Sequence, residues 1–159
     1  MATKKRCKAY RPKQIVANPL NYLFGGLKRI DPDNLVTLNC QNHAALVTII
    51  SGRGTRATWD KLTGCINMAL IMCELGTGDE YRTTLEAGRE ALITLGRRYL
   101  KHGTSAFTGG ELTAMNEAMA VHDAQLEVSR VIDVERAYAE IDRRLRHHIN
   151  TFNVTSAAA

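Results

Sequence analysis

The stretch "ISGRGTRATW", residues 50–59, decides between two fold classes. Gly52, Gly54 and Ala57 have the G-x-G-x-x-A spacing of a dinucleotide-binding turn. Such a turn needs a parallel sheet around it, with a strand before the glycines and further strands beside that one. "LVTII" precedes the glycines as one candidate strand, but the apolar residues after Ala57 recur at helical steps of three and four. We therefore expect a connector between two helices, and an all-α bundle of about four main helices.

The helix before this connector is predicted to begin at Asp31-Pro32, because an Asp N-cap followed by proline is a strong helix start. Gly52 is its predicted stop, and its apolar residues are Leu35, Leu38, Leu46, Ile49 and Ile50. Thr55 or Thr58 is expected to cap the next helix, and Gly76 and Gly78 to end it. The apolar row of that second helix consists of Trp59, Leu62, Ile66, Ala69, Leu70 and Cys73.

A third helix is predicted from about Asp79 to His102, with Gly103 as its stop. Gly88 lies within its apolar row, so another helix is expected to approach closely at that position. The full row is Tyr81, Leu85, Gly88, Leu92, Leu95 and Tyr99.

The start of the last helical segment, "FTGGEL" at residues 107–112, carries two signals at once. Thr108 and Glu111 have capping-box spacing, and Phe107 and Leu112 have hydrophobic-staple spacing. After Gly110, neither Gly nor Pro occurs before Asn150, which permits a helix of roughly 40 residues and about 60 Å.

The apolar residues of this segment form two rows that are displaced by two residues, or roughly half a helical turn. The first row is Leu112, Met115, Met119, His122 and Leu126, and the second is Val131, Val134, Tyr138, Ile141 and Leu145. Two interpretations remain open. The helix breaks near Ser129 and folds back onto the bundle, or residues 130–150 project from it as a helix that binds a partner or a second copy.

Composition places these helices in one domain. The chain has 159 residues, 45% of them hydrophobic, and we expect an extended arm at residues 1–18 and a single helical domain at 19–159. The four cysteines, Cys7, Cys40, Cys65 and Cys73, form no C-x-x-C pair and are expected to be reduced thiols. No segment has the length of a signal peptide's apolar core or a membrane span, so a soluble, cytoplasmic protein is predicted.

The formal net charge of +5 comes from the arm, which contains six basic residues and no acidic residue: Lys4, Lys5, Arg6, Lys8, Arg11 and Lys13. Tyr10 lies among them, an arrangement that suits phosphate contact with base stacking. The alternative is a basic tail without a defined role.

Two further groups of arginines are candidates for contact with an anion or a partner. Arg53 and Arg56 lie beside a helix N-terminus, where free N–H groups favour an anion. Arg143, Arg144 and Arg146 lie near a helix C-terminus, where Glu140 and Asp142 have the four-residue spacing that pairs with the latter two arginines.

The one group that resembles an acid–base or metal set is His122-Asp123 with Glu117 and Glu127. His122 falls on the apolar row, which favours a hydrogen-bonded core histidine over a ligand. We therefore predict no catalytic, metal-binding or cofactor-binding residues, and a protein that is not an enzyme.

Taken together, the arm "KAYRPK", the "NHAAL" helix, the Gly-x-Gly-Thr-Arg connector and the "HDAQL" helix resemble small helical proteins encoded by phages and prophages. The resemblance implies an accessory protein inside a bacterial host. From it we expect a non-enzymatic protein that binds and modulates a host or defence protein complex, as a homo-oligomer built through the last helix. The alternative is a nucleic-acid-binding regulator that uses the arm and the C-terminal arginines.

Overall fold

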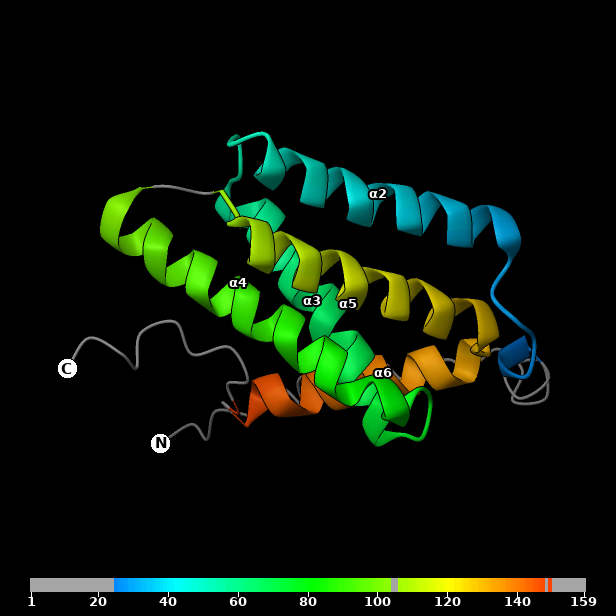
Figure 1. The fold of residues 1–159 in the computed structure, drawn as a ribbon. Helices are drawn as coiled ribbons and strands as arrows, with labels where there is room; N and C mark the ends of the chain where they lie inside the picture. Colours follow the sequence, from blue (N-terminus) through cyan, green and yellow to red (C-terminus); the bar gives the residue numbers. More distant parts are fainter. Residues whose placement is uncertain (1–24, 104–105, 148, 150–159) are drawn as a thin grey trace, which may run out of the picture.

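The computed structural model describes residues 25–103, 106–147 and 149, and within these ranges it contains five α-helices and no strand (Figure 1). The predicted all-α bundle is confirmed. The basic arm, with its six cations and Tyr10, lies outside the described residues, as do Cys7 and His148.

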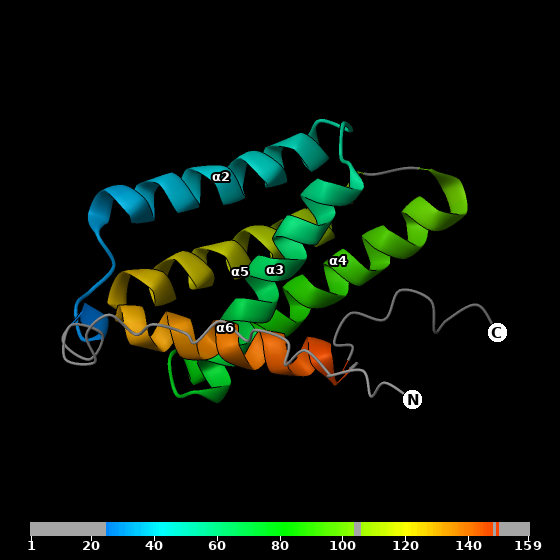
Figure 2. The ribbon, with the colours of Figure 1, turned by 180° about the vertical axis from the view of Figure 1, so that it is seen from behind.

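The helices are α2 (Pro32–Ile50), α3 (Arg56–Glu74), α4 (Arg82–His102), α5 (Gly109–Val128) and α6 (Val131–Arg146). A short 3-10 turn, η1 (Asp79–Tyr81), precedes α4. Helix α3 packs against each of the other four helices, and nine of its residues are buried. Figures 1 and 2 show α2 along one edge of the bundle and α6 along the opposite edge.

Three of the predicted helix starts are those of the structure, whereas the third helix, expected from about Asp79, begins as α4 at Arg82, after the 3-10 turn. The Asp31 carboxylate accepts hydrogen bonds from the N–H groups of Asp33 at 3.0 Å and Asn34 at 3.3 Å, which satisfies two of the free donors of α2. Thr55 is the N-cap of α3, and the backbone N–H of Thr55 donates a hydrogen bond of 2.8 Å to the hydroxyl oxygen of Thr58. At α5 the N–H of Thr108 donates to Glu111 at 2.8 Å, which confirms that the capping box is formed.

Glycines end three of the helices, also as predicted. Gly52 and Gly76 follow α2 and α3 with φ of 72° and 94°, and Gly103 caps α4 with φ of 69°. These left-handed conformations strain any residue with a side chain, so glycine is the natural terminator at each point. The stretch around Gly52 is a connector between helices, and the dinucleotide-binding alternative is excluded.

Helices α4 and α5 approach each other closely at Gly88. A Cβ atom placed on Gly88 would lie 2.5 Å from the Cβ of Ala118. The predicted close approach at this glycine is therefore confirmed, and it brings Leu85 and Leu92 onto Met115 and Met119 in the main core.

The main core is aliphatic and sulfur-rich, as the low aromatic content implies. Trp59 is half-buried at its edge and donates its indole N–H to the carbonyl of Leu92 at 3.0 Å. Tyr81 and Tyr99, at the two ends of the predicted α4 row, lie outside this core. They lie beyond the crossing with α5 and are half-exposed. Among the described cysteines, Cys40, Cys65 and Cys73 are free.

The last helical segment breaks at Ser129, as the first of the two interpretations predicted. Ser129 and Arg130 are extended, with ψ of 153° and 158°, and Arg130 forms an isolated bridge with Arg29. The Ser129 hydroxyl donates to the carbonyl of Gln125 at 2.6 Å, and the Asp133 carboxylate accepts from the N–H of Arg130 at 3.2 Å. These side chains satisfy backbone groups at the break, so the chain turns there without Gly or Pro.

Candidate protein-binding surfaces

Helix α6 lies against α3 through a narrow inner face. Ala137 is fully buried, and Val134 and Ile141 pack beside it against a second core cluster that includes Met68 and Met72. These three residues, at steps of three and four, define the side of α6 that faces the bundle. Their small and branched side chains let α6 lie close to α3.

The outer face of α6 leaves large apolar side chains at the surface. Tyr138 is 58% exposed and Leu145 is 67% exposed, while Val131 is half-buried at the start of the helix. The prediction that the five residues Val131, Val134, Tyr138, Ile141 and Leu145 share one partner-binding row is therefore wrong in part. The row is split because Ala137, which the apolar pattern did not include, faces the core and turns Val134 and Ile141 inward.

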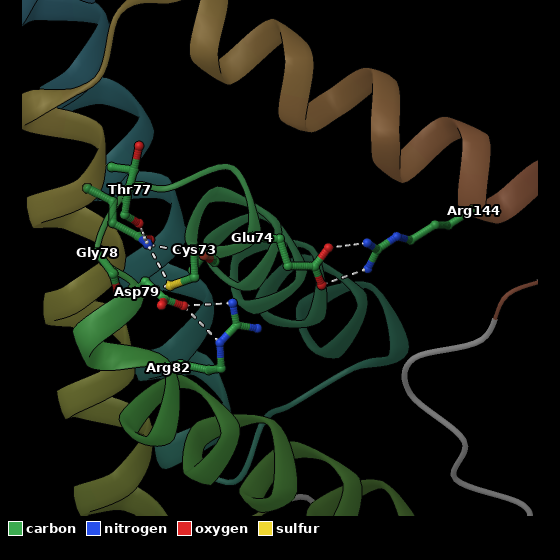
Figure 3. A network of polar contacts seen from close by, with 9 residues as sticks. Cys73, Glu74, Thr77, Gly78, Asp79, Arg82 and Arg144 are labelled. Atoms are coloured by element: carbon green, nitrogen blue, oxygen red, sulfur yellow. Dashed lines mark hydrogen bonds and ion pairs between the residues drawn. The ribbon is translucent and has the colours of Figure 1, made fainter.

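Arg144 anchors the C-terminal half of α6 to the end of α3. Its guanidinium pairs with Glu74 of α3, as Figure 3 shows. It also pairs with Glu140 of its own helix, and the Arg144 side chain is only 20% exposed. The hydrogen bonds from Arg143 and Arg144 lower the pKa of the Glu140 carboxyl to about 2. The carboxylate is therefore charged at neutral pH and holds both arginines.

The other predicted arginine contacts of α6 are also occupied within the helix. Arg143 donates two hydrogen bonds of 2.7 Å to Glu140, and Arg146 pairs with Asp142. The predicted pairs at four-residue spacing, Glu140 with Arg144 and Asp142 with Arg146, are confirmed. The positive charge of this cluster is therefore matched by carboxylates of the described chain.

A polar network fixes the turn between α3 and α4 against α5. The buried amide of Gln125 donates to the carbonyls of Ala69 at 3.1 Å and Thr77 at 2.8 Å, and the Cys73 thiol donates to the carbonyl of Gly78 at 3.0 Å. Figure 3 shows Cys73 and Thr77 in this network, next to the ion pair between Asp79 and Arg82. Burial raises the pKa of the Cys73 thiol, which keeps it protonated as a donor.

The arginines of the connector have local partners. Arg56 pairs with Asp60 on the next turn of α3 at 3.1 Å, and Arg53 donates to the Ser51 hydroxyl at 3.2 Å. The Thr55 hydroxyl already accepts from the N–H of Thr58 at 3.3 Å. Part of the anion-attracting character of this helix end is therefore satisfied by the connector itself.

The four residues that resembled an acid–base set do not converge. His122 is buried inside the bundle, where desolvation lowers its pKa to about 4 and keeps the ring neutral, while Glu117 and Glu127 are exposed on the outside of α5. Among the described residues, the Nδ1 atom of His122 has no hydrogen-bond partner, so the hydrogen bond that we predicted for this histidine is not found at that nitrogen. Asp123 instead accepts a hydrogen bond of 2.7 Å from His43 of α2.

Within the described ranges, no three His, Cys, Asp or Glu residues are placed to share a metal ion. A pocket of about 60 Å³ lies between the end of α3 and the start of α6, lined by Met72, Leu75, Thr77, Asp133 and Arg136. Its volume is well below the roughly 300 Å³ at which small-molecule sites begin. None of the helices in the described part of the chain combines the length and apolarity that crossing a membrane requires.

A second exposed apolar surface, on α2, was not predicted. Val36 is 62% exposed, Val47 59% and Ile50 44%, and Cys40 lies exposed between them. Ile50 was expected among the buried residues of this helix and is not. The sequence does carry a signal for this surface, because residues 34–52 contain no Asp, Glu, Lys or Arg although one of their faces is in water. Loss of charge from an exposed helix is typical of interface cores.

Comparisons with known proteins identify no relative of this chain, so the argument for its function rests on the surfaces described above. The chain matches no protein-family model, and no curated protein and no solved structure shows significant similarity to it.

Proposed function

We propose that this chain is a non-enzymatic accessory protein of the phage or prophage type, which binds a protein complex of its bacterial host or of the host's defence. It acts in the host cytoplasm, and it modulates the complex by covering part of its surface. The outer face of α6 is the contact surface.

The observation that carries this proposal is the exposure of Tyr138 and Leu145 on a helix whose inner face is already held. Tyrosine and arginine are enriched among the residues that dominate protein–protein affinity. Arg146, which follows Leu145 in the chain, is exposed and pairs with Asp142 on the same helix. An apolar centre with a charged rim is the ordinary composition of such an interface.

The alternative is a nucleic-acid-binding regulator, for which the described residues give less support. With the six cations of the arm set aside, the chain has 15 Lys and Arg residues against 16 Asp and Glu residues. Arg143, Arg144 and Arg146 of α6 are paired with carboxylates. Binding to nucleic acid therefore depends on the arm, and retarded duplex DNA or RNA with a steep dependence on salt is the result that would favour it.

The test is capture from a bacterial host lysate by the immobilised protein, with a double variant Tyr138→Ala/Leu145→Ala beside the wild type. The wild type is expected to retain a specific protein, which the variant loses by tenfold or more, because both apolar side chains of the surface are removed. The retained protein is then purified and its dissociation constant measured against both chains.

A matched control is available on α4. Tyr99 and Leu100 are 46% and 67% exposed, close to the values of the α6 pair, so Tyr99→Ala/Leu100→Ala removes the same groups from another surface. This control is expected to bind as the wild type does. Equal loss of binding in both double variants, or in neither, contradicts the assignment of the surface to α6.

A further inference from the structure

The exposed surface of α2 has a regular spacing as well as an absence of charge. Val36, Cys40, His43, Val47 and Ile50 follow one another at steps of four, three, four and three residues. These steps place all five residues along one side of the helix. The helix has 19 residues, or about 28 Å, so the row runs over most of its length.

We infer that this row, the α2 face, pairs with the α2 face of a second copy of the chain in antiparallel orientation. A dimer with two-fold symmetry uses the same patch on both subunits, so the patch must be complementary to itself. The row itself contains no Asp, Glu, Lys or Arg, so pairing two copies brings no like charges of α2 together. The Asp123 carboxylate of α5, which contacts His43, is only 22% exposed and is already paired with that histidine.

The spacing of the row gives the register of the pair. It is nearly symmetric about His43, so an antiparallel partner places Val36 opposite Ile50 and Cys40 opposite Val47 of the other copy. Each of these pairings occurs twice, once on either side of the two-fold axis, and His43 lies beside His43 of the other copy. The row thus forms four apolar layers, as two helices with a heptad-like seam do.

The charges at the two ends of α2 favour the antiparallel orientation. In this register Asp33, at the start of the helix, lies opposite Arg53, just past its end, in both halves of the dimer. Both side chains are exposed, and neither has an ion-pair partner within the described ranges. A parallel pair would instead bring Asp33 close to its own copy, and the antiparallel pair also opposes the two helix dipoles.

The other occupants fit this face less well. The arm at residues 1–13 is rich in cations, and the α2 row has no carboxylate of its own to receive them. The carboxylate that lies beside the row, that of Asp123, is already paired with His43 at 2.7 Å. A nucleic acid requires positive charge, which residues 34–52 lack entirely. The second copy is the occupant that matches both the neutral centre and the opposite charges at the ends.

The first experiment measures the mass of the purified full chain by sedimentation. At tens of micromolar the wild type is expected to have twice the chain mass of 17.6 kDa. Val47→Glu buries an unpaired carboxylate in each half of the pair, so its dimer is expected to dissociate at least tenfold more readily. Val128→Glu is the matched control, since Val128 is 62% exposed on α5 and is expected to leave the dimer intact.

The second experiment tests the register. In a Cys7→Ser background, Val47→Cys brings a thiol opposite Cys40 of the other copy, within the reach of a disulfide at a Cα separation of about 4.4–6.8 Å. Oxidation with copper phenanthroline is expected to give a covalent dimer at least tenfold faster than in Val128→Cys. Cys7→Ser alone is expected to crosslink slowly, because an antiparallel pair keeps the two Cys40 residues apart.

Several outcomes overturn this inference. The inference is overturned if the wild type is monomeric at tens of micromolar. It is also overturned if Val47→Cys crosslinks no faster than Val128→Cys. Rapid crosslinking through Cys40 alone contradicts the antiparallel register. A disulfide within one chain between Cys7 and position 47, formed when Cys7 is retained, shows that the arm occupies the face. None of these results bears on capture through α6, which uses a different helix.

Discussion

Helices α5 and α6 are separated by only two residues, but the fold holds them by different means. Six residues of α5 are buried, among them Met115, Met119 and Leu126, and α5 meets α4 at the close contact of Gly88. Helix α6 has one buried residue, Ala137, and depends on half-buried neighbours and on the ion pair of Arg144 with Glu74. Helix α5 is therefore part of the core of the bundle, whereas α6 is attached at its edge and keeps most of its side chains for contact with solvent or a partner.

The largest expected effect concerns His122, the buried histidine of α5. Its pKa is about 4 in the folded chain against an ordinary value of 6.5, because burial disfavours the charged ring. Between these two values the unfolded chain takes up a proton that the folded chain does not. Stability is therefore expected to fall as the pH falls from 6.5 towards 4, by about 1.4 kcal/mol per pH unit and about 3 kcal/mol in total.

The measurement is the free energy of unfolding by urea across this pH range, for the wild type and for His122→Gln. The glutamine does not titrate, so the variant is expected to lose most of the slope even where its stability at neutral pH is lower. A slope that is unchanged in the variant would show that another group takes up the proton, and that α5 is not the acid-sensitive helix.

The next effect concerns the contact between α4 and α5. Gly88→Ala places a Cβ 2.5 Å from that of Ala118, so the helices must move apart. We expect a loss of about 1–3 kcal/mol in the free energy of unfolding, the usual cost of overpacking. The double variant Gly88→Ala/Ala118→Gly relieves the clash and is expected to recover part of this loss.

Gly64 of α3 provides the matched control for this substitution. It is also in the middle of a helix, but a Cβ at that position meets no atom of the described residues within 4 Å. Gly64→Ala is therefore expected to stabilise the chain by about 0.5–1 kcal/mol, since alanine restricts the unfolded chain and favours the helix. Equal effects at the two glycines would contradict the close packing of α4 on α5.

The helix boundaries could be predicted from the sequence because each depends on a few neighbouring residues. Asp31-Pro32, Thr55 and the pair Thr108–Glu111 start helices through hydrogen bonds that are local in the chain. Gly103 ends one through its left-handed backbone. The helical spacing of the apolar residues after Ala57 argued against the dinucleotide-binding interpretation of residues 50–59.

The surfaces could not be predicted in the same way, because a surface depends on how helices turn toward one another. The apolar pattern of α6 mixed two faces of the helix. Val134 and Ile141 pack in the second core cluster beside Ala137, which the pattern omitted, whereas Tyr138 and Leu145 are exposed. In α2 the pattern missed Val36 and Val47, because an apolar residue on an exposed helix face and one in the core look alike in a sequence. The uncharged run at residues 34–52 was the available signal.

Amide hydrogen exchange of the full chain tests most directly the distinction between a core helix and an attached one. Helices α3 and α5 are expected to exchange only through global unfolding, while α6 opens separately and exchanges at least tenfold faster, because it buries little and is held by a partly exposed ion pair. Exchange of α6 at the same rate as α5 would contradict this account, since the helix proposed to bind a partner would then be part of the core.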